Sequence, residues 1–119
     1  MSLELAIKHA LLNPIKARGR TSMPRLAAVL SNGRSTVVGY NSYKTHPLQA
    51  RFGTDEHKIH IHAEIAAIRK GSARRIRFKD FTLYVARVLA DGTVANSRPC
   101  TGCLAAIKEF GVKKVFYTE

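Results

Sequence analysis

Residues 57–71 read "HKIHIHAEIAAIRKG" and join a histidine cluster to the start of an apolar helix. The alternation in "KIHIH" indicates an extended approach, and the residues from Ala63 to Lys70 predict a helix that ends at Gly71. Residues i and i+2 of a regular helix point in nearly opposite directions. His62 and Glu64 can therefore face one point only if His62 lies at the non-helical entrance.

The periodicity and turn signals on either side of this stretch predict the other elements. They are a helix at 2–12, a β-hairpin of strands 25–31 and 35–41 with a turn at Asn32-Gly33, a strand at 80–90, a helix from about Pro99 to Phe110 with Gly111 as its C′ residue, and a strand at 112–118. Helices separate the last three strands, which predicts that these strands are parallel. We expect an α/β fold in a single domain spanning 1–119, a three-layer α/β/α sandwich with a mixed sheet of four to five strands.

The composition is ordinary except for its charge. Of the 119 residues, 45% are hydrophobic, and 20 Lys and Arg against 8 Asp and Glu give a formal charge of +12. The excess suits phosphorylated substrates or single-stranded nucleic acid, and it equally suits a solvated basic surface. No apolar run approaches the roughly 20 residues that span a bilayer, and the N-terminus lacks the pattern of a signal peptide. We expect a cytoplasmic protein without a membrane partner.

A second motif, "PCTGC" at 99–103, contains both cysteines of the chain. At spacing i and i+3 in the first turn of a helix, Cys100 and Cys103 share one face, and the helix dipole lowers the pKa of a thiol there. Two thiolates and one histidine bind zinc and leave a fourth position open for water, as in a catalytic site. The alternatives are a redox pair, a structural zinc site with His60 as fourth ligand, and a His62 that merely caps its helix.

Taken together, "HAE" at 62–64, "PCTGC" at 99–103 and "GYN" at 39–41 make the chain resemble the cytidine/deoxycytidylate deaminase superfamily of zinc-dependent deaminases. The pattern H-x-E followed by P-C-x-x-C is the signature of these enzymes. The segments "VGYNSYKTHP" and "ANSRPCTGC" are similar to those of small members from phages and bacteria, which places our expectation of a cytoplasmic protein in a bacterial or phage-infected cell.

The resemblance implies a role for each matching residue. His62, Cys100 and Cys103 would bind Zn²⁺, and Glu64 would move protons between the water, the ring nitrogen and the leaving amine. The Ala63 N–H would face the base carbonyl, the Pro99 carbonyl would accept from the amino group, and Asn41 would bind sugar or base, unless it is only a turn residue that closes its strand. Apart from the resemblance, the long loop after Asn41 offers Tyr43 to stack on a base and Lys44, His46 and Arg51 to bind a 5′ phosphate, and its alternative is a basic surface loop.

The implied reaction is hydrolytic deamination of a cytosine nucleotide or nucleoside to the uracil form, with release of ammonia. One alternative is deamination of cytosine or adenine in single-stranded DNA, RNA or tRNA, and another is a non-enzymatic zinc-stabilised binding module. The family core normally has a fifth strand, whereas four are predicted here. We therefore expect a homo-oligomer in which a neighbouring subunit supplies the missing contacts.

Overall fold

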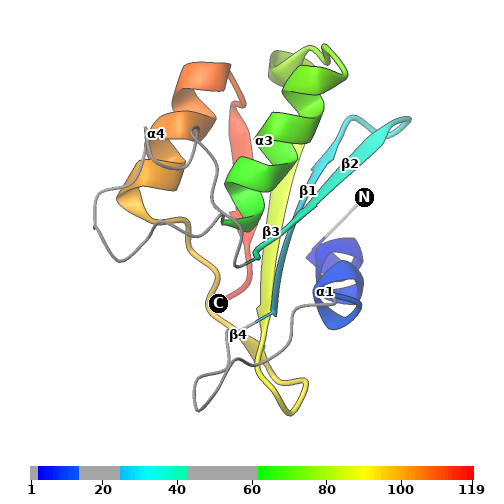
Figure 1. Cartoon of the computed structure of the whole chain (residues 1–119), viewed down its shortest axis with the longest axis vertical. Coiled ribbons are helices and arrows are strands. Elements are labelled where there is room, and N and C mark those ends of the chain that lie inside the picture. Colours follow the sequence, from blue (N-terminus) through cyan, green and yellow to red (C-terminus); the bar gives the residue numbers. More distant parts are fainter. Residues whose placement is uncertain (1–2, 14–24, 43–61) are drawn as a thin grey trace.

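The computed structural model describes residues 3–13, 25–42 and 62–119 and has three layers (Figure 1). Helix α1 (Leu3–Leu11) covers one face of a five-stranded sheet, and helices α3 (Ala63–Ala73) and α4 (Thr101–Phe110) cover the other. The strands are β1 (Arg25–Ser31), β2 (Thr36–Tyr40), β3 (Thr82–Val88), β4 (Val94–Ala95) and β5 (Lys114–Tyr117), and a short 3₁₀ turn, Phe78–Asp80, precedes β3. The predicted α/β/α sandwich is confirmed. No helix in the described ranges is both long and apolar enough to cross a membrane.

The sheet is mixed, and β3 is its hub. Strand β1 lies between β2 and β3 and is antiparallel to both, whereas β5 pairs with β3 in parallel. Strands β2, β3 and β5 therefore run in the same direction, as the helices between them predict. The two-residue β4 was not predicted. It pairs antiparallel with the end of β3, and β5 pairs with the beginning, so both occupy one edge of β3.

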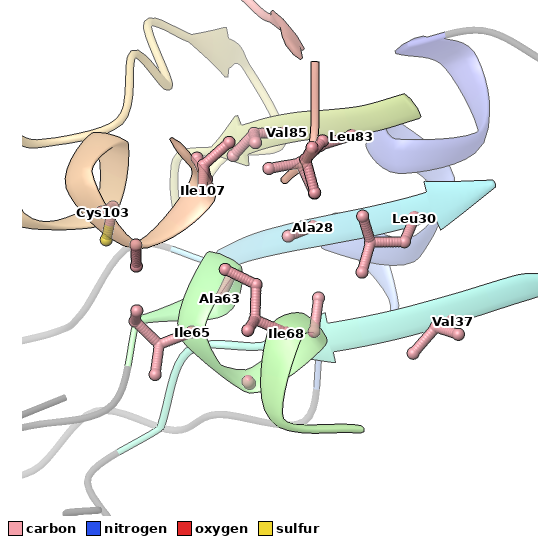
Figure 2. Close-up of a cluster of buried hydrophobic side chains, with 14 of the residues drawn as sticks. Ala28, Leu30, Val37, Ala63, Ile65, Ile68, Leu83, Val85, Cys103 and Ile107 are labelled. Carbon is pink, nitrogen blue, oxygen red and sulfur yellow. The ribbon is translucent and has the colours of Figure 1, made fainter. Parts of the chain in front are cut away.

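Alternation along the strands separates two buried layers. In β3, Leu83 and Val85 belong to the large cluster beneath α3 and α4, whereas Ala86 and Val88 belong to the smaller cluster beneath α1. Figure 2 shows Leu83 and Val85 lying toward Ile107 of α4 in the large cluster. Because of this alternation, only every second residue of a strand faces α3 and α4 and can reach the region where these helices begin.

Helix α3 packs directly on the backbone of β2 because position 39 is a glycine. A Cβ on Gly39 would lie 2.5 Å from the carbonyl oxygen of Ala63 and closer still to the backbone nitrogen of Ala67. Any side chain at this position would push the first turns of α3 away from the sheet. Gly39 thus sets the depth at which the helix begins.

The C-terminal end of α3 differs from the prediction. The helix passes through Gly71 to Ala73, and the left-handed residue that ends it is Arg75, with φ of 56°. The Ile76 N–H donates to the Gly71 carbonyl and the Arg75 N–H donates to the Ser72 carbonyl, which is the pattern of a Schellman motif. Gly71 instead faces the side chains of Ile76 and Phe78, which a Cβ there would meet at 2.8 and 3.1 Å.

Helix α4 and the hairpin end as predicted. Gly111 is left-handed, with φ of 93°, and closes α4. Gly33 has φ of 90° in the connection between β1 and β2, where Asn32 accepts hydrogen bonds through its side chain from the next turn residues, Arg34 and Ser35. These glycines occupy a conformation that other residues rarely adopt.

Candidate active site

The start of α3 places His62 outside the helix. His62 is the N-cap residue, with extended φ and ψ of −83° and 156°, and Ala63 is the first helical residue. The predicted break in helical geometry between His62 and Glu64 is therefore confirmed. Because Ala63 occupies the first helical position, its N–H has no acceptor within the helix.

The start of α4 is capped by a cysteine. Cys100 is the N-cap residue, and its Sγ accepts a hydrogen bond from the Cys103 N–H at 3.4 Å. The helix begins at Thr101, so Pro99, predicted near its first residue, precedes the cap and is buried there. The Cys103 side chain is fully buried, and both cysteines are free thiols.

The two helix starts bring three possible metal ligands together. His62 Nδ1 lies 3.3 Å from Cys103 Sγ and 3.7 Å from Cys100 Sγ, and the three ligand atoms all lie within 4.8 Å of one another. In a tetrahedral zinc site, bond lengths near 2.1 and 2.3 Å put nitrogen and sulfur about 3.6 Å apart. The separations and the donor types therefore fit zinc.

The pKa values of the two cysteines are shifted in opposite directions. Hydrogen bonds from Cys103 and from His62 lower the pKa of Cys100 to about 3, so Cys100 is a thiolate. The same interaction with Cys100, together with burial, raises the pKa of Cys103, which keeps its proton. A metal ion would replace that proton, because zinc binds cysteine as thiolate.

Glu64 is a buried carboxylate beside this cluster. Its side chain is 3% exposed, and Oε1 has no hydrogen-bond partner among the residues that the structure describes. Burial raises the pKa of Glu64 above its ordinary value, and the hydrogen bond from its own backbone N–H and the positive charge on His62 oppose this only partly. A buried carboxyl with an unused oxygen and a raised pKa is suited to exchanging protons with a ligand.

A cavity of about 360 Å³ opens in front of these groups. It is lined by Leu26, Asn41, His62, Ala63, Glu64, Arg87, Asn96, Ser97, Arg98 and Cys100. Its volume is near the lower end of the range for small-molecule sites, roughly 300–1,000 Å³. Figure 1 shows that α3 and α4 begin at the same end of the sheet, where β2 and β3 end, so the cavity lies beyond the carboxyl ends of these strands.

Asn41 lines the cavity but is held by the fold. Its Oδ1 accepts hydrogen bonds from Asn13 Nδ2 at 2.7 Å and from the Leu26 N–H at 3.0 Å. Asn13, which the sequence indicated only as the end of α1, also donates to the Leu26 carbonyl at 2.8 Å. Both hydrogen bonds hold Asn41 in place at the edge of the cavity.

A hydrogen-bond network fixes the cavity wall before Cys100. The Ser97 hydroxyl donates to the Val85 carbonyl at 2.8 Å, and the Thr118 hydroxyl donates to the Ala95 carbonyl at 2.6 Å. The Ser97 N–H donates to the Thr118 carbonyl, and the Thr118 hydroxyl lies 2.8 Å from the Ser97 hydroxyl. The end of the chain thus holds the segment Asn96–Arg98 against β3.

Several predicted residues lie outside the described ranges, and several cavity residues were missed. Tyr43, Lys44, His46 and Arg51, predicted to contact substrate, and His57 and His60 all fall within 43–61, which the structure does not describe. The cavity residues that sequence reasoning missed are Leu26, Arg87, Asn96, Ser97 and Arg98. Asn96, Ser97 and Arg98 could have been identified from the sequence, because they directly precede "PC" at 99–100. Arg87 could not, because its assignment depends on which face of β3 meets the site.

Known proteins share the pattern and the fold. The family model described as the cytidine and deoxycytidylate deaminase zinc-binding region matches residues 1–119. The apo structure of dCMP deaminase from cyanophage S-TIM5 is 24% identical, with a TM-score of 0.62 over 97% of this chain and 80% of that chain. The structure of the same enzyme in complex with dCMP and dUMP is 19% identical, with a TM-score of 0.61 over 97% and 76%.

A bacterial cytidine deaminase has a similar fold. The structure from Burkholderia pseudomallei is 20% identical, with a TM-score of 0.63 over 94% of this chain and 79% of that chain. No curated protein is similar enough in sequence to add to these comparisons. The family match covers the whole chain, and the geometry of the site agrees with it. The chain therefore belongs to the family of the cytidine and deoxycytidylate deaminase zinc-binding region.

Proposed function

We propose that the protein is a zinc-dependent hydrolytic deaminase that converts a cytosine nucleotide or nucleoside to the uracil form and releases ammonia. One observation carries this proposal: the buried Glu64, whose Oε1 has no hydrogen-bond partner among the described residues, lines the same cavity as a His/Cys/Cys cluster with zinc-like spacing. A purely structural metal site has no use for a carboxylate held at such a cost. The substrate class is supported by the similar phage enzyme, whose structure contains dCMP and dUMP.

In this proposal, His62, Cys100 and Cys103 hold the zinc ion. When bound, zinc supplies a water molecule whose pKa is lowered toward about 7. The cavity in front of these ligands leaves room for water and base, and Glu64 is buried at its inner side.

Glu64 performs the proton transfers. It takes a proton from the attacking water and delivers it to ring nitrogen N3, while the oxygen adds to C4 of cytosine. It then takes the proton of the new hydroxyl and gives it to the amino group, whose bond to C4 breaks so that ammonia leaves. The raised pKa of Glu64 serves both directions of transfer, because the carboxyl must bind and release a proton near neutral pH.

Three further residues orient the substrate in this proposal. The Ala63 N–H, which has no acceptor within its helix, donates to the base carbonyl. The Pro99 carbonyl accepts from the amino group that is lost, and the Asn41 amide donates to the sugar or base. Tyr43, Lys44 and His46 remain proposed substrate contacts. An association between copies of the chain also remains a proposal.

The test is ammonia release by the zinc-loaded protein. Cytidine, deoxycytidine, their 5′ monophosphates, adenosine and a cytosine-containing single-stranded oligonucleotide are compared. We expect turnover of the free cytosine compounds, and activity on the oligonucleotide alone would contradict the proposed substrate class. If none of these compounds releases ammonia, the proposed reaction is refuted, and the alternative of a zinc-binding module without enzymatic activity is favoured.

Glu64→Gln, with Glu4→Gln on the exposed face of α1 as its matched control, tests the residue. We expect Glu64→Gln to keep its zinc content and to lose turnover by a factor of about 100 or more. The control should behave as the parent protein. If the Glu64→Gln variant retains activity, Glu64 does not take part in the reaction. If the variant loses its zinc, Glu64 is a zinc ligand.

A further inference from the structure

An arginine of the central strand faces the cavity. In β3, the side chains of Leu83 and Val85 enter the core beneath α3 and α4, and the period of two carries Arg87 to the same face. Arg87 is paired in register with Leu26 of β1, and both side chains line the cavity. A cation therefore lies in the floor of the site, between the end of the apolar core and the cavity.

The guanidinium of Arg87 has no partner in the described part of the chain. Its Nε is buried without a hydrogen bond, and no described carboxylate forms an ion pair with it. Its backbone N–H, in contrast, is satisfied by the Thr118 hydroxyl at 3.3 Å. Because a partly buried charge without a counter-charge is costly, the position is suited to an anion that arrives from outside.

A second arginine lines the cavity from the segment that is held against β3. Arg98 is exposed, lines the cavity, and makes no hydrogen bond through its guanidinium to any residue that the structure describes. Its backbone is fixed, because the Arg98 N–H donates to Asn96 Oδ1 at 2.9 Å and the neighbouring Ser97 is held by Thr118. Among the described residues that line the cavity, two are arginines and Glu64 is the one acidic residue.

We propose that Arg87 and Arg98 form a subsite for the phosphate of the substrate, so that the enzyme prefers a cytosine 5′ monophosphate to the unphosphorylated nucleoside. This rests on the proposed function, in which the base lies against Glu64 and the zinc ligands. Guanidinium groups match phosphate with paired, charge-assisted hydrogen bonds, which is the reason for choosing phosphate among anions. A cavity of about 360 Å³ accommodates one nucleotide, which favours a free mononucleotide over a phosphate within a strand.

Binding of the reaction product tests the subsite without turnover. Isothermal titration calorimetry of the zinc-loaded protein compares dUMP, deoxyuridine and inorganic phosphate. We expect dUMP to bind about tenfold or more tightly than deoxyuridine, and phosphate to compete with dUMP. Equal affinity for dUMP and deoxyuridine, or no binding of dUMP, overturns the proposal.

Variants assign the preference to the two residues. Arg87→Met and Arg98→Met should each weaken dUMP by about tenfold and change deoxyuridine by less than about twofold. Arg69→Met, on the exposed face of α3, is the control for the loss of one charge and should leave both affinities unchanged. Arg87→Lys keeps the charge without the planar fork and should retain part of the preference. Thermal melting verifies that each variant is folded, and equal losses for dUMP and deoxyuridine in a folded Arg87 variant contradict the assignment.

Activity separates this inference from the proposed function. Phosphate-dependent binding of dUMP without ammonia release would refute the deaminase and leave the subsite standing. Ammonia release at equal kcat/KM from dCMP and deoxycytidine would support the deaminase and refute the subsite. An oligonucleotide that depends on Arg87 as strongly as dCMP does would refute the restriction to mononucleotides.

Discussion

Replacing Glu64 by glutamine should make the metal-free protein more stable. The carboxylate is 3% exposed, and its Oε1 has no hydrogen-bond partner among the described residues. An ionised carboxylate buried in this way costs several kcal/mol, whereas an unsatisfied neutral amide costs about 1–3 kcal/mol. We expect Glu64→Gln to raise the free energy of unfolding by about 1–3 kcal/mol at pH 8, a Tm increase of about 4–12 °C.

The stability gain should depend on pH in a defined direction. Burial raises the pKa of Glu64 above 4.5 in the folded protein, so the folded state holds this proton more tightly than the unfolded state does. The free energy of unfolding of the parent therefore falls as the pH rises from 4.5 through the raised value. Glutamine does not titrate, so its advantage should be small near the ordinary pKa and should reach a plateau above the folded one.

Calorimetric melting between pH 5 and pH 8 measures this difference. The samples contain a chelator and a reductant, and Glu4→Gln serves as the control for the same change at an exposed carboxylate. A Glu64→Gln protein less stable than the parent at pH 8, or an advantage that does not vary with pH, would refute the reasoning. Either result would mean that the carboxylate is stabilised in place.

Three other predictions concern the frame of the site. Because the pKa of Cys100 is about 3, the rate of its alkylation by iodoacetamide in the metal-free protein should hardly change between pH 5 and 8. The rate is measured by peptide mass spectrometry, and a rate that falls about tenfold for each pH unit below 8 would contradict this. Gly39→Ala should lower the free energy of unfolding by about 3 kcal/mol, since α3 must move off β2; an unchanged urea midpoint would show that the helix yields easily. Thr118→Val removes the hydroxyl that contacts Ala95, Ser97 and the Arg87 N–H and should lower the free energy of unfolding by about 2 kcal/mol in thermal melts. Thr118→Ser keeps the hydroxyl and should lower it less, and equal losses in the two variants would show that packing of the methyl group causes the effect.

The cluster of His62, Cys100 and Cys103 was predictable because each of its two halves has a local geometry. An H-x-E pair can converge only across a break in helical geometry; the alternating pattern "KIHIH" predicted that break, and the extended φ and ψ of His62 provide it. The spacing of Cys100 and Cys103 likewise fixed them in one helical turn. The positions of both helix starts at one end of the sheet followed from strands that share one direction.

Other features depended on tertiary contacts that no local pattern shows. Gly71 looked like a helix end, but the helix continues to Ala73 and Arg75 takes the left-handed position. Strand β4 has two residues, too few for an alternating pattern. Arg87 is one of 20 basic residues in the sequence, and only the pairing of β3 identifies it as a cavity residue.

The bonds between Ser97 and Thr118 make two distant parts of the chain open together. Seven hydrogen bonds join Thr118, directly after β5, and Ser97 to each other and to Val85 or Ala95. Amide protons held by such shared contacts exchange with solvent in one cooperative opening. Fraying of the last strand and loosening of the wall that carries Arg98 are therefore a single event, and the lifetime of a bound ligand is coupled to the order of residues 114–118.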